Sequence, residues 1–267
     1  MALRFSSGMV QKLMQNKGLK EALLEGCVRV YSGSQPATAD AAPTGTLLLT
    51  VSKASATYTE GAHSTAQVNS LTITDASVAD SDTYTITITP SPSEYSAQAF
   101  SFVTDASATA NELAQGLCDV INEESRYVVA THNEGGATNI MYITASYPGQ
   151  GFAAITLTTN PGTAIATAAV VTNVRVNGLQ FGLSTAGVLA KEADLVWSGA
   201  VAATGTAGWF RFQANAVDDD SLSTTLIRMD GACGTSNSDM NLSSVNLVAA
   251  TTVTVDTFSI TQPKVRT

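Results

Sequence analysis

Hydrophobic and polar residues alternate with a period of two in many short segments of this chain. The segments SLTITDAS and DTYTITITPS show the alternation most regularly, and this period is typical of β-strands with one buried face. In the last third, turn signals such as NG, STAG, ATGTAG and DGACGTS separate strands at intervals of roughly ten residues, as in a β-sandwich or barrel. The pattern therefore predicts a mainly β fold.

Helical periodicity interrupts this pattern in two places. Near 109–124, Thr109 and Glu112 form a candidate capping box. One helical face there carries Leu113, Leu117, Val120 and Ile121. The first 26 residues carry two apolar stripes broken near 16–18, which predict two short helices. The members of these stripes are Met9, Val10, Leu13 and Met14, then Leu19, Ala22 and Leu23.

The strands indicate a discontinuous domain. The stretch VRVYSGSQPATADAAPTGTLLLTV predicts strand, long turn and strand, but the chain then reaches EGAHS without completing a sheet. Strands of the same kind resume at NVRVNGLQF. We therefore expect an outer, sandwich- or barrel-like β-domain of residues 1–63 and 174–267, with a helical arm at 1–26. Residues 64–173 are expected to form an inserted β-rich domain that carries one helix, since loop insertions are tolerated.

The distribution of charge supports a separate middle domain. The 267 residues have a net charge of −9 and only 13% charged residues, about half the usual fraction of roughly 25%. Residues 64–173 hold ten acidic residues and one basic residue, whereas residues 1–29 hold five basic and two acidic residues. An acidic domain does not suit the phosphate backbone of nucleic acids, so we expect no nucleic-acid partner.

The cysteines and the hydropathy pattern indicate the cellular compartment in which the protein is made. Cys27, Cys118 and Cys233 are odd in number and lack metal-binding spacing, which favours reduced thiols in a protein made in a cytosol. No stretch approaches 18 consecutive apolar residues, and the first 30 residues lack a signal-peptide pattern. We expect no membrane partner.

No motif for catalysis, cofactors or metals is found. The two histidines, His63 and His132, are not spaced from Cys or Asp as ligands, and phosphate-loop, zincin and serine-hydrolase motifs are absent from the sequence. Asp218–Asp220 could hold Ca²⁺, but the run lacks alternating ligand spacing, so a solvated hairpin loop is favoured. The sequence predicts no enzyme, no cofactor and no metal.

Two groups of residues are candidates for contacts with partners. Along WFRF, Trp209 and Arg211 face the same way, and their composition resembles interface hot spots; a second buried sheet face is the alternative. The N-terminal stripes could pack on the chain's own sheet or dock on a neighbouring subunit. The candidate interface residues are Met9, Leu13, Leu19, Leu23, Trp209 and Arg211.

Four segments of the outer blocks have a distinctive sequence: VRVYSGSQPATADAAPTGTLL, VLAKEADLVWSG, GTAGWFRF and RMDGACGTSNSDMNLSSVNLVAATTVTVDTFSITQP. They resemble a group of tailed-bacteriophage virion proteins. The resemblance covers the two outer blocks, about 150 residues, and members of that group typically begin with a short amphipathic helix. The middle block is similar to small β-rich domains inserted in phage tail and capsid proteins, and its presence departs from the simple pattern of the group.

The resemblance implies a structural role without catalysis. We expect a capsid decoration (cement) protein that stabilises the head, assembles with copies of itself and binds other virion proteins. A tail component, such as a tube, adaptor or baseplate-proximal protein, is the alternative, followed by a receptor- or glycan-binding domain of a tail fibre. The expected location is the virion, after synthesis in the cytoplasm of the bacterial host.

Overall fold

The computed structural model confirms a mainly β fold and divides the chain into two compact units. It describes residues 3–15, 17–92, 94–132, 139–159 and 164–261. Unit 1 comprises Met1–His63 and Val176–Thr267, and unit 2 comprises Ser64–Arg175. The sequence predicts boundaries after residues 63 and 173; in the structure they follow His63 and Arg175.

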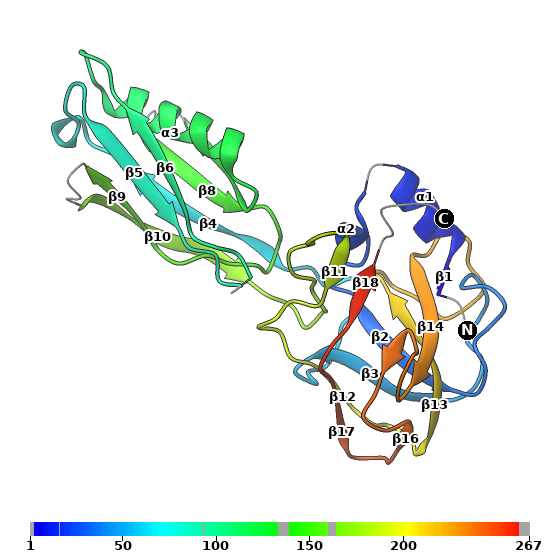
Figure 1. Cartoon of the computed structure of the whole chain (residues 1–267). Helices are drawn as coiled ribbons and strands as arrows, with labels where there is room; N and C mark the ends of the chain where they lie inside the picture. Colours follow the sequence, from blue (N-terminus) through cyan, green and yellow to red (C-terminus); the bar gives the residue numbers. More distant parts are fainter. Residues whose placement is uncertain (1–2, 16, 93, 133–138, 160–163, 262–267) are drawn as a thin grey trace. The chain divides into compact units, whose positions relative to one another are not determined.

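Within its described residues, unit 1 contains a nine-stranded sheet in the order β1-β14-β13-β2-β3-β12-β17, with β15 beside β14 and β16 beside β13 (Figure 1). Its pairs are antiparallel except β14 with β15. The strands are β1 (Arg4–Phe5), β2 (Cys27–Ser32), β3 (Leu47–Lys53), β12 (Trp197–Ala200), β13 (Gly205–Gln213), β14 (Arg228–Gly234), β15 (Met240–Asn241), β16 (Asn246–Leu247) and β17 (Thr252–Val255). A smaller sheet pairs β11 (Val188–Ala190) with β18 (Ser259–Thr261).

The core of unit 1 lies on one face of the larger sheet. Alternate residues of β2 and β13, such as Val28, Val30, Phe210 and Phe212, are fully buried there, as expected for period-two strands. Rings from distant segments pack beside them: the centroids of Phe181 and Phe212 are 5.5 Å apart, and those of Phe181 and Trp197 are 5.4 Å apart. Helices α1 (Ser7–Met14) and α2 (Leu19–Ala22) complete unit 1.

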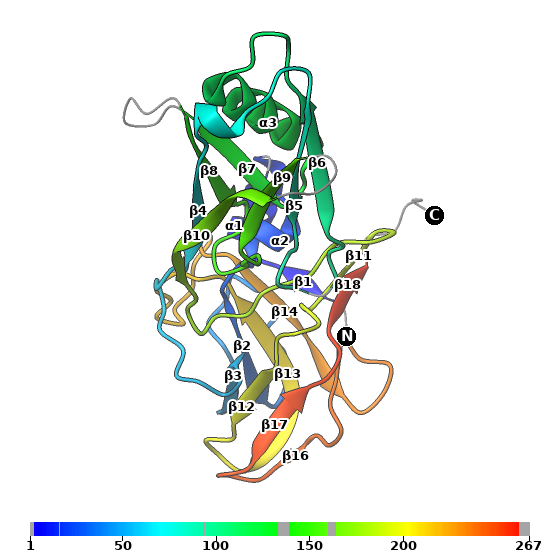
Figure 2. The same ribbon diagram turned by 90° about the vertical axis from the view of Figure 1, so that its left-hand side faces the viewer.

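Unit 2 forms a seven-stranded sheet among its described residues, in the order β6-β5-β9-β10-β4-β8-β7 (Figure 2). The strands are β4 (Thr65–Thr72), β5 (Thr83–Ile88), β6 (Gln98–Val103), β7 (Val128–His132), β8 (Ile140–Ala145), β9 (Ile155–Thr159) and β10 (Ala164–Val174). A short 3-10 helix, η1 (Asp75–Ser77), follows β4. Helix α3 (Ala110–Glu124) lies where sequence analysis expected it.

The start of α3 matches half of the predicted capping box. The Thr109 hydroxyl accepts a hydrogen bond from the Glu112 backbone N–H at 3.1 Å, which satisfies one of the free N–H groups of the first turn. The Glu112 carboxylate, however, accepts from the backbone N–H of Asp105 at 2.9 Å. It therefore ties the helix start to the preceding loop.

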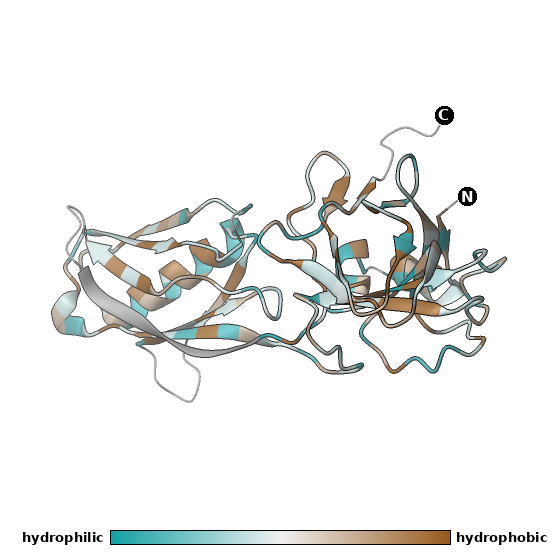
Figure 3. Ribbon diagram, turned by 90° about the horizontal axis from the view of Figure 1, so that it is seen from below, coloured by the Kyte–Doolittle hydropathy of each residue, from teal (hydrophilic) through white to brown (hydrophobic). Residues whose placement is uncertain are grey.

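Helix α3 contacts both edge strands of its sheet, β6 and β7. The Asn122 side chain donates to the Ala130 carbonyl and accepts from the Ala130 N–H, both at 2.8 Å, and so satisfies backbone groups of β7. On the other side, a Cβ at Gly116 would lie 2.3 Å from the Phe102 ring, so glycine permits this close packing. Figure 3 shows both hydrophobic and hydrophilic residues along the long helix of unit 2.

Candidate interaction surface

The six predicted interface residues do not form an exposed surface, which corrects that prediction. Met9, Leu23, Trp209 and Arg211 are 0% exposed, and Leu13 and Leu19 are partly buried. The leucines and Met9 pack in the core of unit 1. Of the two alternatives for the N-terminal stripe, packing on the chain's own sheet is the one observed. These side chains fill the space above the apolar face of the sheet.

Trp209 and Arg211 lie on a second buried face of the same sheet. Register places Arg4, Asp230, Arg211 and Arg29 side by side across β1, β14, β13 and β2. In the next row the Tyr31 and Trp209 rings stack with centroids 4.6 Å apart. This face thus carries charged and aromatic side chains, while the opposite face carries the apolar core.

The loop between β2 and β3 covers this polar face. Arg211 donates to the Ala41 carbonyl at 2.9 Å, and the Trp209 indole N–H donates to the Thr44 carbonyl at 3.2 Å. Arg4 also donates to a carbonyl of this loop, that of Pro36. The loop satisfies buried donors with its backbone, as buried polar groups require. Sequence analysis read this stretch only as a long turn between two strands.

Asp218 and Asp220 belong to an ion-pair network, whereas Asp219 between them is exposed; the expectation of a solvated hairpin loop is therefore wrong for Asp218. Asp218 is 7% exposed, and its carboxylate accepts two hydrogen bonds from Arg228, one of them from Nε at 2.7 Å. Asp220 accepts from Arg29 at 2.6 Å and from the Gln213 amide at 2.9 Å. Arginines thus occupy the positions around these carboxylates that a cation would need.

The electrostatics of the network follow from burial and pairing. Burial by itself raises the pKa of Asp218, but hydrogen bonds from Arg228 and from the Asp220 N–H outweigh it and hold that pKa below its usual value. Burial likewise opposes the charge of Arg228, yet the paired Asp218 raises the pKa of that guanidinium. The pair of Asp218 and Arg228 therefore stays ionised at neutral pH.

The described cysteines and histidines do not form a reactive site. Cys27, Cys118 and Cys233 are free thiols, and burial raises the pKa of each to about 12, so they remain protonated. The His63 ring is largely exposed, with Nδ1 3.2 Å from the Asn215 amide nitrogen, and His132 ends strand β7. Among the described residues no group of three or more His, Cys, Asp or Glu side chains could hold a metal ion.

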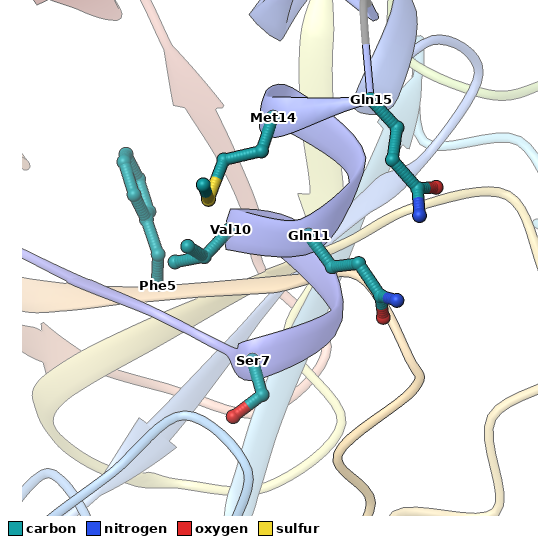
Figure 4. A pocket seen from close by; sticks show the side chains of 6 residues that line it. All are labelled: Phe5, Ser7, Val10, Gln11, Met14 and Gln15. Atoms are coloured by element: carbon teal, nitrogen blue, oxygen red, sulfur yellow. The ribbon is translucent and has the colours of Figure 1, made fainter.

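The most exposed hydrophobic residues of the N-terminal region gather on one side of α1. Met14 is 83% exposed, Val10 44%, Phe5 37% and Leu3 37%. Figure 4 shows Val10 and Met14 pointing toward Phe5, while Gln11 and Gln15 lie on the other side of α1 and point away from it. A shallow hollow on this helix is lined by these five residues and Ser7. A second hollow continues past Phe5 and is lined by Leu3, Leu13, Lys17, Gly18, Leu19, Ile260 and Thr261. We call the side chains of Leu3, Phe5, Val10 and Met14 the α1 surface.

The α1 surface is held on unit 1 by polar contacts at the start of the helix. The Ser6 hydroxyl caps α1 by accepting from the Met9 N–H at 3.1 Å and also donates to the Leu226 carbonyl at 2.7 Å. The Asp40 carboxylate accepts from the Ser7 N–H at 2.8 Å. A Cβ at Gly8 would lie 2.3 Å from the Thr225 carbonyl oxygen, so α1 rests directly against the chain before β14. The apolar side chains are thereby presented on a fixed support.

In the sequence, Val10 and Met14 belong to the first apolar stripe but are not among the predicted interface residues. The sequence nevertheless indicates an exposed apolar side of this helix. Residues 9 and 13 form one apolar row and residues 10 and 14 an adjacent one, so the apolar face is wider than packing on one sheet requires. Leu3 and Phe5 carried no such signal, because the two-residue strand β1 is too short to show alternation.

Comparisons with known protein families, curated proteins and solved structures found no match to the chain. The helices in the described part of the chain are all too short or too polar to span a bilayer.

Proposed function

We propose that this chain is a structural protein of a tailed-bacteriophage virion, and specifically a decoration protein of the head. The observation that carries the proposal is the set of segments that resemble phage virion proteins. These segments are distant in the sequence, yet GTAGWFRF is β13, RMDGACG is β14 and VRVYS lies in β2, three adjacent strands. The resemblance therefore covers one continuous part of the sheet and the loop that closes its polar face.

The chemistry of unit 1 suits this role. Its polar residues are used in buried ion pairs such as Arg211 with Asp230, whose atoms lie 2.8 Å apart, and the thiols are protonated at neutral pH. Among the described residues, unit 1 exposes the four apolar side chains of the α1 surface, and exposed apolar patches of this kind mark contacts between proteins. We propose copies of the same chain and other virion proteins, above all the major capsid protein, as the partners.

Labelling of purified particles tests the proposal. Gold-conjugated antibodies against unit 2 are applied to phage particles from a host that expresses the chain, and the particles are imaged by electron microscopy. We expect label distributed over the head. Label confined to the tail tube, the neck or the baseplate would replace the head assignment with a tail component, and label at fibre tips would favour the receptor-binding alternative. Unlabelled particles would refute a virion role.

A further inference from the structure

We infer that strand β6 of unit 2 pairs along its free edge with β6 of a second copy of this chain, antiparallel and about a two-fold axis at Ser101. The inference rests on the proposed function in one respect, which is the expectation that copies of the chain assemble with one another. The backbone geometry and the side chains of β6 specify the contact itself.

The two end strands of the unit 2 sheet, β6 and β7, differ in how their outer backbone groups are satisfied. At β7, the Asn122 side chain bonds both the N–H and the C=O of Ala130. Figure 2 shows β6 with β5 on one side and no strand of unit 2 on the other. Among the residues that the structure describes, no hydrogen bond from outside the β5–β6 ladder reaches the backbone of Ala99, Ser101 or Val103. A strand edge with unpaired N–H and C=O groups is a template for pairing with another chain.

The hydrogen-bond pattern determines which residues of β6 face this open edge. The Thr104 N–H donates to the Asp82 carbonyl at 3.0 Å, in the register that continues the β5–β6 ladder. Bonded and non-bonded pairs alternate along an antiparallel ladder, so Phe102 and every second residue before it bond to β5. The Ser101 and Thr85 hydroxyls lie 2.8 Å apart, which fits a non-bonded pair, because side chains are closer together there. The residues whose N–H and C=O groups point away from β5 are therefore Ala99, Ser101 and Val103.

Strand β6 lacks the features that normally protect a sheet edge. Its sequence, QAFSFV, contains no charged residue and no proline, and its ladder with β5 has no bulge. Its outward side chains are exposed, Val103 by 58%. Unit 2 as a whole has ten acidic and two basic residues, a net charge of −8, so other parts of its surface repel a second copy. At the β6 edge, two copies of unit 2 can approach each other without bringing acidic side chains together.

The open edge is complementary to itself in one register. With Ser101 of each copy on a two-fold axis, Ser101 lies opposite Ser101, and each Ala99 lies opposite Val103 of the other copy. These are the residues whose backbone groups point outward, so every outward N–H and C=O group of both edges finds a partner. A symmetric contact between identical surfaces closes on itself and yields a dimer.

The side chains fit the same register. Phe100 lies opposite Phe102 on the core-facing side of the strands, and aromatic cross-strand pairs stabilise a sheet. The acid nearest to β6 in the sequence, Asp105, lies opposite Ala97, so the paired segments bring no two acids face to face. Both the backbone and the side chains of β6 therefore suit a second copy of the same strand.

Two substitutions of Ser101 test the backbone pairing in the full chain. Both Ser101→Pro and Ser101→Ala remove the hydroxyl contact with Thr85, but only proline removes the outward N–H. An edge strand tolerates proline where the N–H faces outward, so the ladder with β5 should remain. Self-association is measured by sedimentation equilibrium, and circular dichroism verifies that each variant is folded. We expect Ser101→Pro to weaken association about tenfold or more, because each copy loses a central hydrogen bond. Ser101→Ala is the matched control and should associate as the wild type does.

Charge substitutions at the same residue test the register without proline. Because Ser101 lies opposite itself, Ser101→Asp and Ser101→Lys should each weaken association about tenfold, since like charges directly opposite each other destabilise a strand pair. An equimolar mixture of the two variants should recover most of the wild-type association through mixed dimers. A monomeric wild-type chain, wild-type association of Ser101→Pro, or a mixture that associates no better than its components would overturn the inference. None of these results alters the particle-labelling test, so the two proposals can fail separately.

Discussion

At the scale of single residues, unit 1 buries charged side chains on one face of its larger sheet. The sequence predicts which residues share that face but not that the face is buried. The alternation of WFRF correctly predicted that Trp209 and Arg211 share a face. It could not predict that this face is closed by the β2–β3 loop, because the covering carbonyl of Ala41 lies 170 residues away in the chain. The same holds for Asp220, whose partner Arg29 is 191 residues distant. Long-range pairing leaves no periodic signal.

The buried pair of Asp218 and Arg228 makes the stability of unit 1 dependent on pH. The folded-state pKa of Asp218 is lowered by Arg228 and by the Asp220 N–H, despite the opposing effect of burial. The pKa of an aspartate side chain in an unfolded protein is about 3.9. Because the folded pKa is the lower one, the stabilisation is present above about pH 4 and is lost as pH falls from there through the folded pKa.

We therefore predict that the unfolding free energy of unit 1 falls below about pH 4, and that Asp218→Asn flattens this dependence. At neutral pH the same substitution should cost about 3 kcal/mol, because it leaves Arg228 without its buried partner. Urea titrations followed by tryptophan fluorescence are the measurement, since both tryptophans, Trp197 and Trp209, belong to unit 1. Asp256→Asn, at an exposed position, is the control. An unchanged pH profile in Asp218→Asn would contradict the prediction.

At the scale of elements, the long periodic segments were predictable and the short ones were not. Helix α3 has a cap residue and three apolar positions on one face, so its sequence specifies it locally. The two-residue strands β1, β15 and β16 exist only because longer neighbours such as β14 and β13 provide pairing partners. Helix α1 is intermediate: its existence was predicted, but which of its apolar rows faces the core depends on the sheet beneath it.

Two methionines of α1 test this division between core and surface. Met9 is fully buried and Met14 is 83% exposed in the same helix. We predict that Met9→Ala destabilises unit 1 by about 2–5 kcal/mol through loss of packing, whereas Met14→Ala changes stability by less than about 0.5 kcal/mol. Tryptophan-monitored urea unfolding gives both values. Equal, small effects would mean that the N-terminal residues are a separable arm, and then deletion of residues 1–26 would leave unit 1 folded.

At the scale of the whole molecule, two separate cores account for the division into units. Tyr84, Leu117 and Ile143 belong to one cluster of buried residues and Val30, Trp197 and Phe212 to another. The sequence indicated this division through a change of charge and through strands that stopped at EGAHS and resumed later. The second boundary was placed two residues early, at 173 instead of 175, because β10 runs to Val174 without a turn signal.

The ends of unit 2 lie close together, because Thr65 of β4 pairs with Val174 of β10, and paired residues in an antiparallel sheet lie about 4.5–5.5 Å apart at Cα. On the unit 1 side, Asn177 accepts from the Lys53 N–H at 2.9 Å and donates to the Thr57 carbonyl at 3.0 Å. The contacts that hold the chain just after the second junction are thus made within unit 1. Removal of residues 64–175 should leave them in place.

We predict that joining His63 to Val176 through a short Gly-Ser linker yields a folded unit 1, with a tryptophan-monitored unfolding midpoint close to that of the full chain. Residues 64–175 alone should also unfold cooperatively, because α3 and the sheet enclose their own core. Circular dichroism during urea titration follows this second fragment, which contains no tryptophan. A single substitution, Leu117→Ala, should lower the unfolding free energy of this fragment by about 2–5 kcal/mol. The unfolding free energy of the unit 2 transition in the full chain should fall by the same amount. A cooperative transition in the full chain that is lost in both fragments would mean that the two cores depend on each other.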